Sequence, residues 1–168
     1  MGHFFIMSEL KTLGWREWVR IPDLGIRRIK AKLDTGAKSS CIHAFDVEIL
    51  NSDNGAGARV RFKIAPRQRN EETLVQVEVP LLEYRQVRSS TGHKTNRPVI
   101  RTPIRLAGQR FEIDLTLLDR SEMGFRMLLG RDALRERFVV DPALSYASRK
   151  AKQKGGQSDL LSDKENKI

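Results

Sequence analysis

The stretch IKAKLDTGA, residues 29–37, decides the fold, because an alternating run passes directly into a polar turn. Apolar Ile29, Ala31 and Leu33 alternate with charged residues, which is typical of a strand with one buried face. Asp34-Thr35-Gly36 follows at once, and the glycine allows the backbone to turn tightly and to approach a ligand closely. The stretch predicts a strand that presents a carboxylate at the edge of a sheet. An ordinary polar turn is the alternative that the tripeptide leaves open.

The same two-residue alternation recurs along most of the chain, over residues 45–49, 60–64, 75–79 and 111–117. Turn-forming pairs separate the runs, Asn54-Gly55 before the second and Ala107-Gly108 before the last. One short helix is predicted over residues 131–138, after Gly130. The pattern predicts an all-β protein, a small closed β-barrel with one short helix near the C-terminus.

The composition fits one domain and is unusual only in its charge. The 168 residues hold 31 Lys and Arg against 21 Asp and Glu, a formal net charge of +10. This excess suggests an anionic partner, with nucleic acid as the first candidate. No signal-peptide pattern and no run near the ~18 apolar residues of a membrane span occurs, so we expect no membrane partner. The single cysteine, Cys41, excludes an internal disulfide and suggests a reducing, cytoplasmic location.

A second motif, MLLGRDAL over residues 127–134, joins an apolar run, a glycine and a helix-forming segment. With the earlier Asp-Thr-Gly-Ala it resembles the retropepsin-like aspartic peptidases, in which these two motifs occur in this order. Residues 14–18, 29–37, 43–46 and 123–131 are similar to a bacterial branch of that family, often labelled ATP-dependent zinc proteases. The resemblance implies a retropepsin-like domain over residues 13–147, between an N-terminal segment, 1–12, and a disordered basic tail, 148–168.

The resemblance implies an aspartic endopeptidase that works as a homodimer. Asp34, Thr35 and Gly36 would form the catalytic turn, and the Asp34 carboxylates of two copies would meet and activate water for cleavage of a peptide or protein substrate. Residues 87–99 lie where that family has its flap hairpin. Gly92 and His93, near its tip, would contact substrate; an exposed loop histidine is the alternative for His93.

Basic residues flank the predicted catalytic turn. Lys32 lies two residues before Asp34, so the two side chains share one face of the strand. We expect Lys32, Ala37 and Lys38 to bind substrate, with a preference for acidic peptides, unless both lysines are merely solvated. The bacterial branch is associated with glutamate ligases that add glutamate tails to a ribosomal protein, so the resemblance implies an acidic peptide tail as substrate.

The second motif is expected to support the turn and the dimer, through Leu129, Gly130, Arg131 and Asp132. In retroviral relatives an acidic residue follows the catalytic aspartate by four positions and pairs with the arginine of this motif. That position is Lys38 here, so Arg131 needs another partner, for which Asp46 and Asp132 are the candidates.

We expect no cofactor and no metal. The three histidines and one cysteine of the sequence are too few and too scattered for the three or four ligands of a zinc site. Cys41-Ile42-His43 offers two ligands at most, and no Gly-x-x-x-x-Gly-Lys-Ser/Thr loop for ATP occurs. Two other functions stay open: a catalytically silent peptidase-like binding module, and a basic β-barrel that binds RNA.

Overall fold

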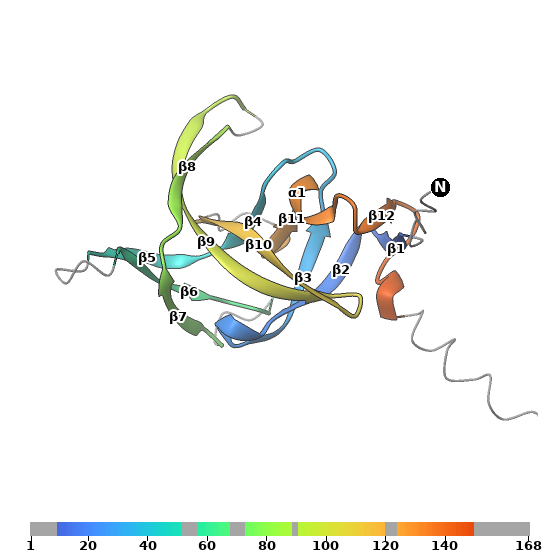
Figure 1. The fold of residues 1–168 in the computed structure, drawn as a ribbon, viewed down its shortest axis with the longest axis horizontal. Helices are drawn as coiled ribbons and strands as arrows, with labels where there is room; N and C mark the ends of the chain where they lie inside the picture. The colour runs from blue at the N-terminus through green and yellow to red at the C-terminus, as the bar shows by residue number, and fades with distance from the viewer. Residues whose placement is uncertain (1–9, 52–56, 68–72, 89–90, 120–123, 150–168) are drawn as a thin grey trace, which may run out of the picture.

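The chain forms a closed barrel of six strands, shown in Figure 1, to which the alternating runs at 29–33 and 111–117 contribute β3 and β10. The computed structural model describes residues 10–51, 57–67, 73–88, 91–119 and 124–149. Around the barrel the strand order is β10-β4-β11-β3-β2-β9, and the pairing of β9 with β10 closes it. These strands are β2 (Arg16–Ile21), β3 (Ile26–Leu33), β4 (Ser40–His43), β9 (Lys94–Leu106), β10 (Gln109–Leu118) and β11 (Met127–Leu129). The predicted all-β fold is confirmed.

The remaining elements surround this barrel. A three-stranded sheet packs on one side, and a parallel pair of strands lies on the other (Figure 1). The sheet contains β5 (Phe45–Leu50), β6 (Arg59–Ile64) and β7 (Val75–Pro80), and the pair contains β1 (Lys11–Gly14) and β12 (Phe138–Asp141). Of the helical segments in the described ranges, none has the length and hydropathy needed to cross a membrane.

The core lies between the barrel wall and the three-stranded sheet. Alternate residues of β3 and of β6 are buried and belong to one apolar cluster. Ile29 and Ala31 of β3 are fully buried, as are Val60, Phe62 and Ile64 of β6. Removing these side chains from water is the main force that holds the two sheets together, at about 25 cal/mol per Å² of apolar surface.

Two local expectations have different outcomes. The Ala107-Gly108 turn is confirmed: both residues have positive φ, 52° and 84°, the conformation required by the tightest hairpins. The expected helix over residues 131–138 is too long, because α1 covers Arg131–Leu134 alone. Glu136 takes a left-handed φ of 63°, and the chain then extends into β12. The Asn54-Gly55 turn and most of the predicted disordered tail lie outside the described residues.

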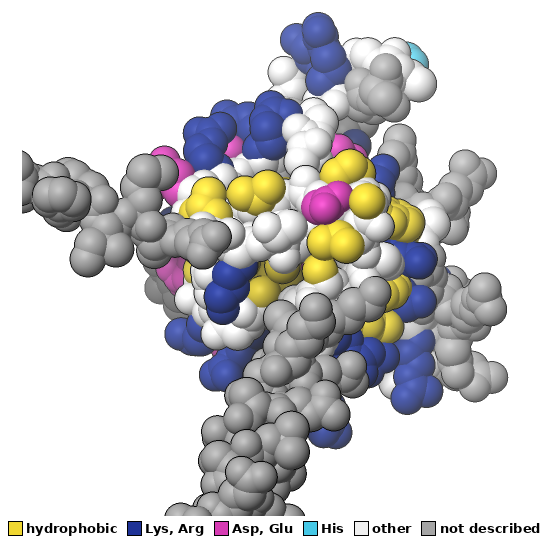
Figure 2. All heavy atoms as spheres, turned by 90° about the vertical axis from the view of Figure 1, so that its right-hand side faces the viewer, with side chains coloured by type: hydrophobic (Ala, Val, Ile, Leu, Met, Phe, Trp, Pro, Cys, Tyr) yellow, Lys and Arg dark blue, Asp and Glu magenta, His cyan; other side chains and the backbone are white. Residues whose placement is uncertain are grey.

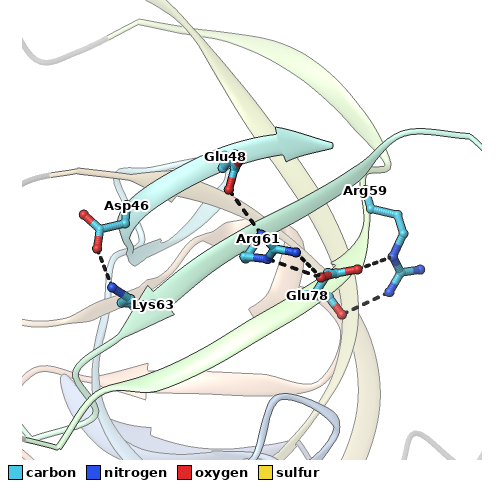
Figure 3. Close-up of polar contacts among 6 residues, drawn as sticks. All are labelled: Asp46, Glu48, Arg59, Arg61, Lys63 and Glu78. Carbon is cyan, nitrogen blue, oxygen red and sulfur yellow. Dashed lines mark hydrogen bonds and ion pairs between the residues drawn. The ribbon is translucent and has the colours of Figure 1, made fainter. Parts of the chain in front are cut away.

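The outer face of the three-stranded sheet carries a ladder of ion pairs (Figure 3). Arg61 lies between Glu48 and Glu78, at 3.4 and 3.1 Å, while Lys63 reaches Asp46 at 2.7 Å. Hydrogen bonds from Arg61 and then from Arg59 hold the pKa of Glu78 below its usual value. Exposed pairs of this kind each stabilise a protein only slightly, but they neutralise the basic residues of β6.

A partly exposed cluster of ion pairs attaches β8 (Glu83–Arg88) to the barrel. β8 pairs with β9 to form the hairpin that rises above the barrel at the top of Figure 1. At its base, Asp114 of β10 accepts hydrogen bonds from Arg101 of β9, at 2.8 Å, and Arg85 of β8, at 3.1 Å. The hydrogen bond from Arg101 is the main cause that lowers the pKa of Asp114.

We therefore predict that acid weakens this attachment. A carboxylate with a lowered folded pKa stabilises the protein fully above the ordinary aspartate pKa of about 4, and this stabilisation is lost as the pH falls through the folded pKa. Asp114→Asn should lower the Tm by about 2–4 °C at neutral pH. Thermal unfolding at pH 7 and pH 3 should show this difference shrinking in acid, and a difference independent of pH would contradict the assignment.

Candidate functional site

The Asp34 turn, residues 34–37, presents one carboxylate that its own backbone holds in place. The N–H groups of Gly36 and Ala37 donate to Oδ1 of Asp34, at 3.0 and 3.2 Å. The other oxygen, Oδ2, lies 3.9 Å from Nζ of Lys32. The Asp34 side chain is 29% exposed and that of Lys32 46% exposed, so both are accessible to a ligand. The prediction that these two side chains share one face is confirmed.

β11 positions the turn by inserting between β3 and β4, parallel to the first and antiparallel to the second. Immediately after β3, the N–H of Asp34 donates to the carbonyl of Leu129, at 2.8 Å. Beyond the turn, the N–H groups of Arg131 and Asp132 donate to the carbonyls of Ala37 and Lys38, at 2.9 and 3.1 Å. The two sequence motifs are therefore one hydrogen-bonded unit.

Gly130 allows this close approach. Its N–H donates to Oγ of Ser40, at 3.0 Å, and a Cβ at this position would lie 2.5 Å from the carbonyl oxygen of Ser39. That distance is far shorter than any normal contact, so a side chain would force the segments apart. Leu129 is likewise buried, in the core.

Arg131 has a different partner from the one expected. Its guanidinium Nη1 donates to the carbonyl oxygen of Thr35, at 3.0 Å. The expected acidic partners are wrong: Asp46 pairs with Lys63 instead, and Asp132 binds through its backbone N–H to the loop before β4. Arg131 thus stabilises the backbone of the Asp34 turn directly. Lys38 replaces the acidic partner of the retroviral relatives, so it leaves the guanidinium of Arg131 available for this bond.

The hairpin residues lie apart from the turn. Gly92 and His93 are exposed at the tip between β8 and β9, which rises above the same end of the barrel as the loop after β3 (Figure 1). The expected hairpin is confirmed. Within the described ranges, no hydrogen bond or ion pair joins Gly92 or His93 to the Asp34 turn, so their contact with substrate stays a prediction. Lys38 is exposed beside the turn.

A polar cleft of about 300 Å³ lies next to the loop that follows the turn. Its charged lining comes from four elements and includes the anchor of the hairpin: Arg85, Arg101, Glu112, Asp114 and Asp132. Sequence reasoning missed all but the last of these. The available signal was the alternation of charged residues on the outer faces of β9 and β10.

The cysteine and histidine of β4 lie in the barrel wall rather than in a site. Cys41 and His43 are buried, and Nδ1 of His43 lies 3.2 Å from the carbonyl oxygen of Leu118. The His43 ring also packs edge-on against Phe45, with centroids 4.3 Å apart. In the part of the chain that the structure describes, no three His, Cys, Asp or Glu side chains are grouped as metal ligands.

A barrel in which an Asp-Thr-Gly turn is held against a Gly-Arg-Asp segment defines a retropepsin-like lobe. The chain belongs to the RimB-like family, described as "Retropepsin-like aspartic endopeptidase RimB", whose model matches residues 12–151. The resemblance seen in the sequence is confirmed.

Curated relatives carry a different name. The chain is 42% identical over 137 residues to a "Probable alpha-L-glutamate ligase" of Desulfotalea psychrophila, covering 82% of this chain and 29% of the relative. Relatives of the same name from Shewanella pealeana and Parasynechococcus marenigrum are 37% and 39% identical, each covering 83% of this chain and 30% of the relative. The chain thus spans less than a third of their length.

A solved structure has a similar fold. A Legionella pneumophila protein of unknown function superposes with a TM-score of 0.68 at 26% identity, covering 82% of this chain and 98% of that protein. The match extends over nearly the whole of that chain.

These names correct the expected function. The sequence predicted a homodimeric aspartic endopeptidase, with a silent binding module or an RNA-binding barrel as alternatives, whereas the relatives at 37–42% identity are named α-L-glutamate ligases. The error arose because a fold and its motif were taken to specify a reaction, and one fold can serve several functions. The coarser expectation holds, since the family and the relatives carry the names of enzymes.

We predict that Gly130→Ala destabilises the protein by about 2–4 kcal/mol, because the new methyl group must displace backbone atoms rather than a flexible side chain. Gly124→Ala is the matched control, since a Cβ at Gly124 meets no atom within 4 Å. Urea denaturation measures both variants. Equal stability of the two would show that the segments around β11 are not closely packed.

Proposed function

We propose that this chain serves α-L-glutamate ligation, as the module that holds an α-linked glutamate peptide at the Asp34 turn. The observation that carries the proposal is the shared segment. A matching segment, 137 to 141 residues long and covering 82–83% of this chain, occurs in three relatives named for that activity. It makes up less than a third of each relative. A segment that recurs within one kind of enzyme supports a role in handling the same substrate or product.

The charges around the turn support an anionic peptide. Lys32 and Lys38 flank Asp34, and the Lys32 side chain is 46% exposed while its ammonium lies 3.9 Å from the carboxylate. Two backbone N–H groups and Lys32 offset the negative charge of Asp34, which reduces its repulsion of a second carboxylate. A glutamate side chain can therefore approach Lys32 without displacing Asp34 from its turn.

An aspartic peptidase is the finer enzymatic assignment that the family description suggests. Hydrolysis by carboxylates requires two of them to share a proton, and one chain supplies one, Asp34. That activity would require a second copy of the chain, so the homodimer stays a prediction. Binding of the glutamate peptide requires only the turn and its lysines.

We expect the chain to bind tetra-α-L-glutamate and not tetraglutamine, and Lys32→Gln to weaken the peptide about threefold to fivefold, through loss of one exposed charge pair. Lys63→Gln is the matched control, because Lys63 is exposed and already paired with Asp46. Calorimetric titration measures the affinities. Equal binding of the two peptides would contradict the proposal.

Mass spectrometry of the same mixtures separates binding from hydrolysis. An intact glutamate peptide assigns a binding role alone, whereas fragments that disappear with Asp34→Asn assign the peptidase activity in addition. Sedimentation of the chain under the same conditions tests the homodimer, which hydrolysis by paired Asp34 residues requires.

A further inference from the structure

A cleft lined by arginines lies on the outer face of the barrel, away from the Asp34 turn. It has a volume of about 340 Å³, and five arginines from four strands and the C-terminal segment surround it: Arg20, Arg28, Arg105, Arg110 and Arg149. We call this feature the arginine cleft. Figure 2 turns the right-hand side of Figure 1 toward the viewer, and many Lys and Arg side chains, in dark blue, gather over the lower half of that face.

The arginines of this cleft differ from the other arginines of the barrel and the three-stranded sheet in their ion pairing. None of the ion pairs in the described part of the chain involves any of them, whereas Arg59, Arg61, Arg85 and Arg101 are each paired with a carboxylate. Arg20 and Arg105 lie directly opposite each other on β2 and β9. Like charges in that position repel and destabilise a sheet. The folded chain therefore holds a repulsion that an anionic ligand would relieve.

A line of basic side chains connects the arginine cleft to the Asp34 turn. Arg28, Lys30 and Lys32 occupy alternate positions of β3, so they lie along one face of the strand that ends at Asp34. We call these three residues the basic stripe. At about 3.3 Å per residue, the six positions from Arg28 to Asp34 span about 20 Å. An extended peptide of about six or seven residues covers the same length.

The aromatic residue of the cleft favours carboxylates over nucleotides as ligands. The ring of Trp18 is covered on one side by the guanidinium of Arg28, at 3.8 Å, and stacks on Tyr146 at 5.6 Å. Proteins that bind single-stranded RNA present aromatic faces on which bases stack, and here those faces are occupied. Guanidinium groups, in contrast, bind carboxylates through two parallel hydrogen bonds.

We propose that the arginine cleft and the basic stripe form a second binding site for a chain of acidic residues, whose other end reaches the Asp34 turn. This inference rests on the proposed function, because it extends the binding surface for the same glutamate peptide from the Asp34 turn to the arginine cleft. Chains long enough to reach both ends gain affinity from the simultaneous contacts, while a tetrapeptide reaches one end alone. The site thus makes binding depend on the length of the glutamate chain.

The test compares tetra- and deca-α-L-glutamate with the full chain at one fixed salt concentration. We expect the longer peptide to bind at least about tenfold more tightly, and Arg20→Gln/Arg28→Gln/Arg105→Gln to remove this gain. Arg59→Gln/Arg61→Gln/Lys63→Gln is the matched control: it removes three positive charges that are already paired on β6 and should keep the gain. Thermal unfolding confirms that both triple variants are folded.

Two results would overturn the inference. One is a decapeptide affinity that the three arginine substitutions leave unchanged; if Lys32→Gln still weakens the tetrapeptide, the proposed function survives and the second site alone fails. The other is a ten-nucleotide RNA that binds as tightly as the decapeptide, which would assign the cleft to nucleic acid. If neither glutamate peptide binds the unmodified chain, the proposed function fails together with the second site.

Discussion

The insertion of β11 between β3 and β4 is the constraint on which the rest of the structure depends. Three residues fill the gap in the barrel wall, and the last of them, Leu129, accepts the N–H of Asp34; the start of α1 then donates to the carbonyls of Ala37 and Lys38. Glycine at position 130 lets the strand pass within contact of Ser39. Without β11 the barrel has no closed wall at this point, the Asp34 turn has no partner for its N–H, and Arg131 cannot reach Thr35.

Local patterns in the sequence predicted the strands, and they did so because burial on one face has a period of two residues. They could not predict how the strands pair. β3 and β11 are parallel neighbours separated by about a hundred residues of chain, and β4 lies parallel to β10 in the same way. Alternation records which face of a strand is buried and nothing about the strand beside it. The end of α1 was missed for another reason: a turn over residues 135–137, in which Glu136 takes a positive φ, ends the helix before β12 begins.

In the candidate site, too, some features were predictable from the local sequence and others were not. Lys32 beside Asp34 was predictable, because two residues along one strand share a face whatever the fold. The partner of Arg131 was not, because it is a backbone carbonyl, which every residue offers equally. The arginine cleft escaped prediction because its residues come from four strands, and no stretch of the sequence contains more than two of them close together. The reaction was mistaken for a deeper reason: a turn and a fold determine where a carboxylate lies, and the partners around it determine what it does.

The net charge of +10 acquires meaning only when each basic residue is assigned its neighbours. On β6 the arginines and Lys63 alternate with carboxylates from β5 and β7, so their charges are neutralised within the sheet (Figure 3). On β2 and β9, by contrast, Arg20 and Arg105 face each other, and no ion pair in the described part of the chain involves either of them. The basic residues of these two faces therefore have opposite effects on stability. One stabilises the fold slightly, and the other costs stability unless an anion occupies it, which is the physical reason to look for the ligand there.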